Sequence, residues 1–271
     1  MPELPEVETT RRGIAPALVG RRIVDAAVRD RRLRWPIDKH FESAVKQQTV
    51  RQVERRGKYI LITLDTGTLI VHLGMSGSLR VLEAGVPPRL HDHWDLVLDS
   101  GKILRFHDPR RFGSLHWTTT DPHQHKLLAK LAPEPLSHAF DADYVFRATR
   151  KRQVAIKQFI MNSQVVVGVG NIYASEALFR AGISPRRAAH RITRVQAAAL
   201  TKAIKEVLAE AIEIGGTTLR DYVNPDGIPG YFRQKLFVYE RAGEACRVCK
   251  TPVKQFLQGQ RSTYWCATCQ R

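Results

Sequence analysis

The chain has 271 residues and is 43% hydrophobic, enough for one large or two medium-sized domains with substantial cores. Its formal net charge of +17 favours a polyanionic partner, most often nucleic acid. No apolar run reaches the roughly 18 residues of a membrane span, and no secretory signal opens the sequence. We therefore expect a cytoplasmic or nucleoid-associated protein that does not enter a membrane.

The first six residues carry the most reactive group that the sequence offers. Removal of Met1 leaves Pro2 with a secondary amine, and a pKa of about 7.7–8.0 keeps part of such an amine neutral and nucleophilic at neutral pH. It can condense with a sugar C1 carbon to an iminium, and Glu3 lies beside it for proton transfer. Pro5 and Glu6 also suit a first helical turn, so an ordinary helix start is the alternative for these residues alone.

The next stretches predict a helix followed by short strands. Val7, Ile14 and Leu18 share one side of a helix over residues 7–19, which Gly20 ends. Apolar, β-branched and aromatic residues predict strands over residues 22–33, 59–64, 68–73, 94–98 and 102–106. Short strands joined by turns indicate a β-sandwich, and we place this domain, with its flanking N-terminal helix, at residues 1–132.

Two loops that follow these strands contain residues suited to a DNA groove. Met75 lies in residues 73–77, and Arg110 and Phe112 lie in residues 108–113. An apolar side chain can wedge between bases, and an arginine can fill a vacated place in the duplex. Taken singly, each loop is more simply interpreted as a turn that buries an apolar residue.

Lys58 and His91 are candidates for phosphate contacts. Lys58 follows two arginines at the start of a strand, where it can bind a phosphate or donate a proton. The alternative for Lys58 is a solvated basic edge. His91, His93 and His72 could suggest a metal site, but a phosphate contact by a histidine is the favoured interpretation.

Beyond a break at residues 133–135 the pattern becomes helical. Helices are predicted over residues 144–150, 154–161, 172–181 and 193–213. The glycines at 168 and 170 place Asn171 at a helix start, where backbone N–H groups suit a phosphate, although a tight turn is equally compatible. We place a helical domain at residues 133–224 and a Pro- and Gly-rich loop and linker at residues 225–236.

The four cysteines all lie in the last 26 residues, at Cys246, Cys249, Cys266 and Cys269. Two C-x2-C pairs separated by sixteen residues have the spacing of a four-thiolate zinc site. The strands between them would form a hairpin with Gly259 at its turn and Arg261 just past the tip. We predict one structural Zn2+ in a zinc finger over residues 237–271, with two disulfides as the alternative.

These motifs together resemble bacterial formamidopyrimidine-DNA glycosylase. The resemblance rests on the N-terminal Met1-Pro2-Glu3-Leu4-Pro5-Glu6, the loops at 73–77 and 108–113, the segments at 167–173 and 215–218, and the four cysteines. It covers essentially the whole chain. It implies an α+β multidomain fold: an N-terminal β-sandwich, a helix-two-turn-helix domain and a C-terminal zinc finger.

The resemblance also implies an activity. The protein would be a monomeric bifunctional enzyme that removes 8-oxoguanine and formamidopyrimidines from double-stranded DNA and then cuts the abasic site. It assigns Pro2 as the nucleophile, Glu3 as general acid/base, Lys58 as proton donor in β-elimination and Arg261 to δ-elimination. Met75, Arg110 and Phe112 would enter the duplex, His91, Arg152 and Asn171 would bind phosphate, and the 225–236 loop would cover the everted base.

Two other functions remain open. An oxidised-pyrimidine glycosylase, as in endonuclease VIII, shares the amine and the glutamate. A non-catalytic zinc-ribbon DNA-binding protein fits the charge and the cysteines but gives no reason for Pro2, Glu3 and Lys58 together. The sequence departs from the family pattern at Arg152, which is often lysine, and after Lys157, where a proline is usual.

Overall fold

A computed structural model of the chain describes residues 2–215 and 236–271. The chain divides into two compact units. The described residues of the first are 2–129 and 215, and those of the second are 130–214 and 236–271.

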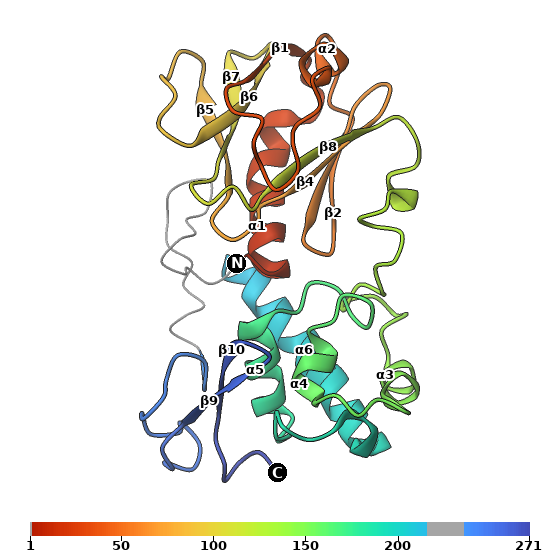
Figure 1. Cartoon of the computed structure of the whole chain (residues 1–271), viewed down its shortest axis with the longest axis vertical. Coiled ribbons are helices and arrows are strands. Elements are labelled where there is room, and N and C mark those ends of the chain that lie inside the picture. Colours follow the sequence, from red (N-terminus) through yellow and green to blue (C-terminus); the bar gives the residue numbers. More distant parts are fainter. Residues whose placement is uncertain (1, 216–235) are drawn as a thin grey trace. The chain divides into compact units, whose positions relative to one another are not determined.

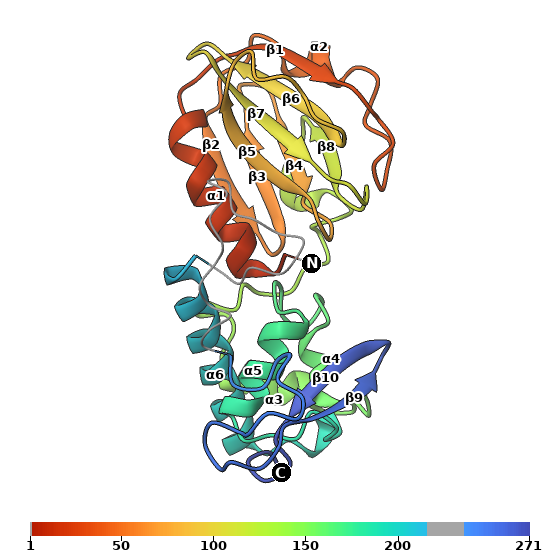
Figure 2. The ribbon, with the colours of Figure 1, turned by 90° about the vertical axis from the view of Figure 1, so that its left-hand side faces the viewer.

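The first unit is a sandwich of two four-stranded antiparallel sheets (Figures 1 and 2), as the sequence predicted. One sheet has the order β1-β6-β7-β5 and the other β2-β3-β4-β8. The strands are β1 (Ile23–Val28), β2 (Gln52–Arg56), β3 (Tyr59–Thr63), β4 (Thr68–His72), β5 (Ser78–Glu83), β6 (Asp92–Leu98), β7 (Lys102–His107) and β8 (Ser114–Thr118). Two short helices, α2 (Phe41–Val45) and η1 (Pro122–Gln124), lie in the connections.

Alternate residues of the two sheets form one apolar core. Ile60 and Ile62 on β3, and Leu104 and Phe106 on β7, are fully buried in the same cluster. A period of two is expected where only one face of a strand packs inward. The predicted hairpins β3–β4 and β6–β7 are confirmed.

One predicted strand is shorter than expected. The strand predicted over residues 22–33 ends at Val28. The carboxylate of Asp30 accepts a hydrogen bond from the N–H of Arg32 at 2.9 Å, which turns the chain away from the sheet. The basic pattern after Val28 therefore belongs to a turn.

Helix α1 (Leu4–Leu18) packs against β2, β3 and β5, so it closes the side of the sandwich where the edge strands β2 and β5 lie (Figure 2). It begins three residues before the predicted position. Glu3 is its N-cap, and the N–H of Glu3 donates to Glu6 Oε2 at 2.9 Å. This hydrogen bond provides an acceptor for a backbone N–H that would lack one in an uncapped helix.

The second unit combines helices with a hairpin. Its elements are α3 (Ala142–Thr149), α4 (Ile156–Ile160), α5 (Asn171–Arg180), η2 (Ala189–Arg191), α6 (Arg194–Glu213), β9 (Lys254–Gln258) and β10 (Arg261–Trp265). Helix α6 contacts α3 and α5, and α5 contacts β10. All four predicted helices and the predicted hairpin are confirmed, although α4 is shorter than expected. Residues 225–235 of the predicted loop lie outside the described residues.

Among the described residues, no helix combines the length and the apolar character that crossing a membrane requires.

A buried ion pair in the first unit gives a stability prediction. Asp95 accepts from Arg105 at 2.7 Å and from Arg29 at 2.6 Å. Burial raises the pKa of Asp95, but hydrogen bonds from the two guanidinium groups outweigh it and leave the pKa below its usual value. Asp95→Asn should lower the free energy of unfolding at pH 7 by about 3 kcal/mol, because the buried Arg105 then loses its shortest ionic contact and keeps only Asp92, at 3.6 Å.

The difference in the free energy of unfolding between wild type and Asp95→Asn should reach its full size above about pH 4, which is close to the pKa of an aspartate in the unfolded chain. It should shrink as the pH falls through the lower pKa of the folded state, because the wild-type carboxylate is then protonated too. Denaturant unfolding followed by tryptophan fluorescence measures it. Asp25→Asn, which breaks the exposed pair with Lys46, is the matched control and should change little. A difference that is independent of pH down to pH 2 would contradict the ionic explanation.

Candidate active site and zinc centre

The start of α1 holds the predicted nucleophile and the predicted acid/base in a buried position. Pro2 is buried, and Glu3 and Glu6 are each only 2% exposed. Because Glu6 Oε2 accepts from the Glu3 N–H, the backbone beside Pro2 is fixed by a side chain of its own helix. A buried carboxylate next to a chain terminus is suited to proton transfer in a site from which water is excluded.

One guanidinium connects α1 with the turn that carries Lys58. Arg55 donates to Glu8 Oε2 at 3.2 Å and to the carbonyl of Gly57 at 3.0 Å. Lys58 follows in this turn, between β2 and β3. The sequence interpretation that residues 55–59 start a strand is therefore wrong: Arg55 and Arg56 end β2, and Gly57, with φ of 58°, turns the chain.

Glu8 is the anionic centre of this connection. Burial acts to raise the pKa of Glu8, but hydrogen bonds from Arg11 and Arg12 and the charge of Arg55 bring it below its usual value. The shortest contacts are 2.8 Å to Arg11 and 2.8 Å to Arg12. Glu8 is therefore ionised at neutral pH and serves to hold cations rather than to exchange protons.

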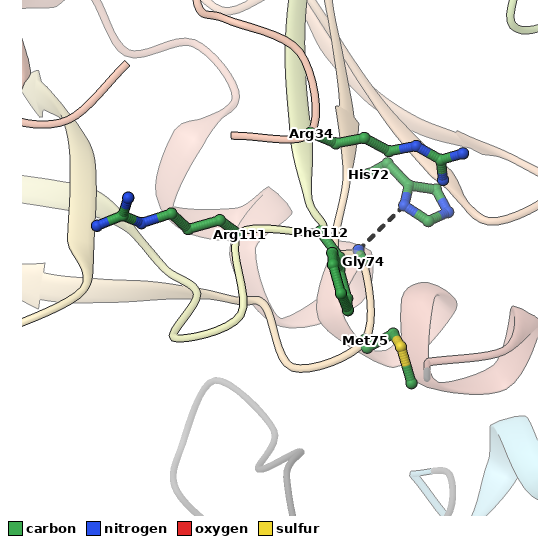
Figure 3. A pocket seen from close by; sticks show the side chains of 6 residues that line it. All are labelled: Arg34, His72, Gly74, Met75, Arg111 and Phe112. Atoms are coloured by element: carbon green, nitrogen blue, oxygen red, sulfur yellow. Dashed lines mark hydrogen bonds between the residues drawn. The ribbon is translucent and has the colours of Figure 1, made fainter. Parts of the chain in front are cut away.

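The two predicted wedge loops lie against each other in the first unit. The backbone of Gly74 is so close to the second loop that a Cβ atom there would lie 2.4 Å from the Gly113 nitrogen. Met75 is partly exposed and Phe112 is 44% exposed. Figure 3 shows the side chains of Met75 and Phe112 pointing to the same side of these loops. The structure thus brings together two apolar residues from separate parts of the sequence.

The two arginines of the second loop have different surroundings. The Arg110 guanidinium is exposed and lies 5.0 Å from the centre of the Phe112 ring, within cation–π range. Arg111 instead pairs with Asp30 at 3.0 Å and points away from Phe112 in Figure 3. Of the two, Arg110 is the one placed to act beside Phe112.

A pocket of about 500 Å3 is lined by Met75 and Phe112, and His72 also forms part of its wall (Figure 3). Burial, together with the charges of Lys58 and Arg34, lowers the pKa of His72 to about 4. His72 is therefore neutral at pH 7, and its Nδ1 accepts a hydrogen bond from the Gly74 N–H at 3.0 Å. This bond helps to fix the backbone that precedes Met75.

His91 adjoins the same loops through the main chain. Its carbonyl accepts from the Asp108 N–H at 3.0 Å, and its φ of 72° marks a tight reversal before β6. His93 is buried and its Nε2 bonds to the carbonyl of Asp108 at 2.7 Å. Because His93 points inward to the backbone and His91 is partly exposed, His91 is the histidine available to a ligand.

In the second unit, Asn171 belongs to a polar cluster with the zinc hairpin. Its Oδ1 accepts from Lys157 Nζ at 2.6 Å, and its Nδ2 donates to the Ser262 carbonyl at 3.0 Å. Lys157 also donates to Thr263 Oγ1 at 2.8 Å. Although Lys157 is only 1% exposed, its charge is solvated by these acceptors.

Arg261 and Arg152 are both exposed, at different places in this unit. Arg261 is the first residue of β10, directly before Ser262, and therefore lies beside the Asn171 cluster. Arg152 lies in the loop between α3 and α4, where its carbonyl accepts from the His190 N–H at 2.9 Å. His91 is in the other unit, so of the three predicted phosphate ligands only Asn171 and Arg152 share one.

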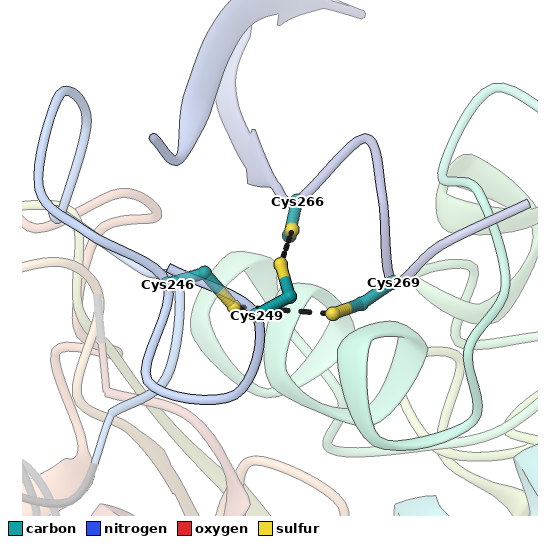
Figure 4. Close-up of side chains that lie close together, drawn as sticks. All are labelled: Cys246, Cys249, Cys266 and Cys269. Atoms are coloured by element: carbon teal, nitrogen blue, oxygen red, sulfur yellow. Dashed lines mark hydrogen bonds between the residues drawn. The ribbon is translucent and has the colours of Figure 1, made fainter. Parts of the chain in front are cut away.

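The four cysteine side chains converge, as predicted (Figure 4). Their sulfur atoms all lie within 4.8 Å of one another, with Cys249 and Cys266 at 3.3 Å and Cys246 and Cys269 at 3.9 Å. None forms a disulfide. Each C-x2-C pair forms one knuckle of the site and supplies two sulfur atoms. Four sulfur atoms at these separations suit a tetrahedral Zn2+, and four thiolates leave no position for a catalytic water. The site is that of one structural zinc ion.

Binding of a cation would change the protonation state of this donor set. Burial and the neighbouring sulfurs raise the pKa of the Cys269 thiol to about 12. A thiol with such a high pKa becomes a thiolate when a divalent cation coordinates it.

The structure adds residues that the sequence interpretation passed over. Asp108 is fully buried between the wedge loops, and Lys157 connects Asn171 to the hairpin. Glu176 on α5 is 1% exposed and accepts from the N–H groups of residues 237–239 at 2.8–3.0 Å, which fixes the chain that leads to the cysteines. These buried charged residues could be recognised only after the fold was known, because each has at least one partner that is distant in sequence: Ser76 for Asp108, Thr263 for Lys157 and residues 237–239 for Glu176.

A β-sandwich with an N-terminal helix, followed by a helical unit with a four-cysteine hairpin, defines a class of multidomain zinc-finger proteins. Three family models match in this order: the formamidopyrimidine-DNA glycosylase N-terminal domain at residues 1–115, the formamidopyrimidine-DNA glycosylase H2TH domain at 131–223, and the zinc finger found in FPG and IleRS at 243–271. Formamidopyrimidine-DNA glycosylases of Thioalkalivibrio sulfidiphilus and Methylococcus capsulatus are 62% and 58% identical over 100% of both chains. The chain belongs to the formamidopyrimidine-DNA glycosylase family.

Solved structures agree with this assignment. The MutM (Fpg) protein of Thermus thermophilus is 41% identical, with a TM-score of 0.89 over 99% of this chain and 98% of that one. The Lactococcus lactis Fpg in complex with DNA that contains an abasic site is 30% identical, with a TM-score of 0.92 over 99% of each chain. The resemblance and the fold class expected from the sequence are confirmed.

The zinc centre gives a direct prediction. The purified chain should contain one equivalent of zinc, and a variant with both Cys246→Ser and Cys249→Ser should lose most of it, because two ligands cannot complete the tetrahedron. Metal analysis after gel filtration measures this. Val248→Ala, in the same knuckle and 65% exposed, is the control and should keep the metal. A full equivalent of zinc in the double variant would refute the assignment.

Proposed function

We propose that this chain is a base-excision repair enzyme that removes oxidised purines, 8-oxoguanine and formamidopyrimidines, from double-stranded DNA and then cleaves the resulting abasic site. Its nucleophile is the secondary amine of Pro2 after removal of Met1. Its substrate is chromosomal DNA, so we place it in the bacterial cytoplasm in association with the nucleoid. The Lactococcus lactis relative, solved in complex with DNA that contains an abasic site, supports this choice of substrate.

The observation that carries the proposal is the geometry at the start of α1. Pro2 and Glu3 are buried at a capped helix terminus, and Arg55 connects this helix to the turn with Lys58. A helix start with only a structural role would not require that the turn carrying Lys58 be fixed beside it. It would also not require a buried carboxylate next to its first residue. An amine, a carboxylate and an ammonium are the groups that Schiff-base chemistry uses, and Arg55 joins the two elements that carry them.

The chemistry follows from these groups. The Pro2 nitrogen attacks C1′ of the damaged nucleotide, the bond to the base breaks, and the base leaves with that electron pair and takes up a proton. Glu3 protonates the deoxyribose ring oxygen as the ring opens, which leaves an iminium between Pro2 and C1′. The iminium withdraws electrons, so loss of the C2′ proton expels the 3′-phosphate, and Lys58 is the proposed proton donor in this step. A second elimination, assigned to Arg261, expels the 5′-phosphate, and water then releases the amine.

The base must leave the duplex before this attack, because C1′ is not accessible inside the stack. Met75, Arg110 and Phe112 are the proposed residues that enter the vacated space. Met75 and Phe112 point to the same side of the paired loops (Figure 3), and the Arg110 guanidinium lies 5.0 Å from the centre of the Phe112 ring. His91, Arg152 and Asn171 are the proposed phosphate contacts. Residues 225–235, proposed to cover the everted base, lie outside the described residues.

The borohydride trapping experiment tests the proposal. Incubation with a duplex that contains 8-oxoguanine, in the presence of borohydride, should give a covalent adduct because the reductant converts the iminium to a stable amine. Without borohydride the strand should be cut. A chain with one extra residue before Pro2 should do neither, because its proline nitrogen is then an amide.

Glu3→Gln should reduce base removal by at least about a hundredfold, the usual contribution of general acid–base catalysis. Glu54→Gln, at an exposed position of β2, is the matched control and should retain wild-type rates. A wild-type chain that binds the duplex but never forms an adduct would refute the enzyme and favour a zinc-ribbon DNA-binding protein. A preference for thymine glycol over 8-oxoguanine would move the assignment to the oxidised-pyrimidine enzymes.

A further inference from the structure

Asp108 lies between the two wedge loops and is 0% exposed. One of its carboxylate oxygens accepts from Ser76 Oγ at 2.8 Å and from the Arg110 N–H at 3.2 Å. The other accepts from the Gly113 N–H at 2.8 Å. One buried side chain is therefore bonded to the Met75 loop and to both ends of the Arg110–Phe112 segment.

The main chain of Asp108 extends these connections. Its N–H donates to the carbonyl of His91, and its own carbonyl accepts from His93 at 2.7 Å. The loops that Asp108 joins are already in backbone contact, since a Cβ atom at Gly74 would lie 2.5 Å from the carbonyl carbon of Phe112. Contact alone does not fix their relative position, because neither Gly74 nor Gly113 has a side chain that could interlock. The directional bonds to Asp108 supply that restraint.

We propose that Asp108, acting through Ser76, is a positioning residue that makes Met75, Arg110 and Phe112 insert into DNA as one preformed unit. The inference rests on the proposed function, since it concerns how that enzyme everts its substrate base. Flipping a nucleotide costs the free energy of unstacking its base, which inserted side chains must offset. Side chains that are already held in their inserting arrangement lose less conformational entropy on binding.

The proposal distinguishes two substrates. An 8-oxoguanine duplex presents a stacked base that must be expelled, whereas an abasic duplex has no base at this position. A residue that acts only by fixing the wedge should therefore matter much more for the first substrate. A residue that only maintains the fold should matter equally for both.

The test is the single-turnover cleavage rate of both duplexes by Ser76→Ala, which removes only the bond between the loops. We expect cleavage at 8-oxoguanine to fall about tenfold and cleavage at the abasic site to stay within about threefold, given a lost hydrogen bond to a buried charge. Asp108→Asn, which replaces one accepting oxygen by an amide, should show the same selective loss. Ser78→Ala, two residues along on β5, is the matched control and should leave both rates unchanged.

A second measurement tests whether Ser76 acts through the wedge. In a chain that already carries Met75→Ala, adding Ser76→Ala should change the 8-oxoguanine rate by no more than about twofold, because the coupled group is gone. A full tenfold loss in that background, equal losses on both duplexes, or no loss on either would overturn the proposal. Thermal melting of each variant verifies that it is folded. A wild-type chain that cleaves neither duplex would instead overturn the proposed function.

Discussion

The contact between Glu8 and Arg55 is the interaction on which the N-terminal part of the site depends. Helix α1 and the β2–β3 turn are separate elements, and the proposed nucleophile on one can act with the proposed proton donor on the other only if the distance between the two elements is fixed. A single guanidinium that bonds to a helix carboxylate and to a turn carbonyl provides this restraint. Since Glu8 also binds Arg11 and Arg12, its charge is compensated from three directions in a partly dry setting.

The same principle recurs in each part of the site. A buried ionisable residue lies next to each set of proposed site groups and helps to fix their positions: Glu8 in the first turns of α1, Asp108 between the wedge loops, and Lys157 beside Asn171. Burying a charged side chain is unfavourable in free energy unless hydrogen-bond partners surround it. Each of these residues is therefore compatible with few alternative positions of its partners. Rigidity is thus concentrated where the chemistry needs accuracy.

The sequence was sufficient for features that depend on local pattern. The four cysteines, the helix start with Pro2 and Glu3, and the two hairpins could be predicted because spacing, capping and periodicity act over a few residues. Strands β2, β5 and β8 could not be predicted with the same rules, since β2 is largely polar and its pairing with β3 is set by the whole sheet. Asp108 and Lys157 were missed as site residues for a related reason, because their partners lie up to 106 positions away.

Lys157 also has a consequence for how damage to the zinc centre would spread. Two acceptors of its ammonium, Thr263 Oγ1 and the Ser262 carbonyl, belong to the hairpin that carries the cysteines. If the hairpin came apart, this buried ammonium would lose both of them, and its bond to Asn171 would be affected as well. The loss of one metal ion would then be transmitted to the N-terminus of α5, some ninety residues earlier in the chain. The zinc hairpin and the helical unit should therefore open as one cooperative segment in hydrogen exchange, and an oxidant that attacks the thiolates would disable the helix terminus along with the finger.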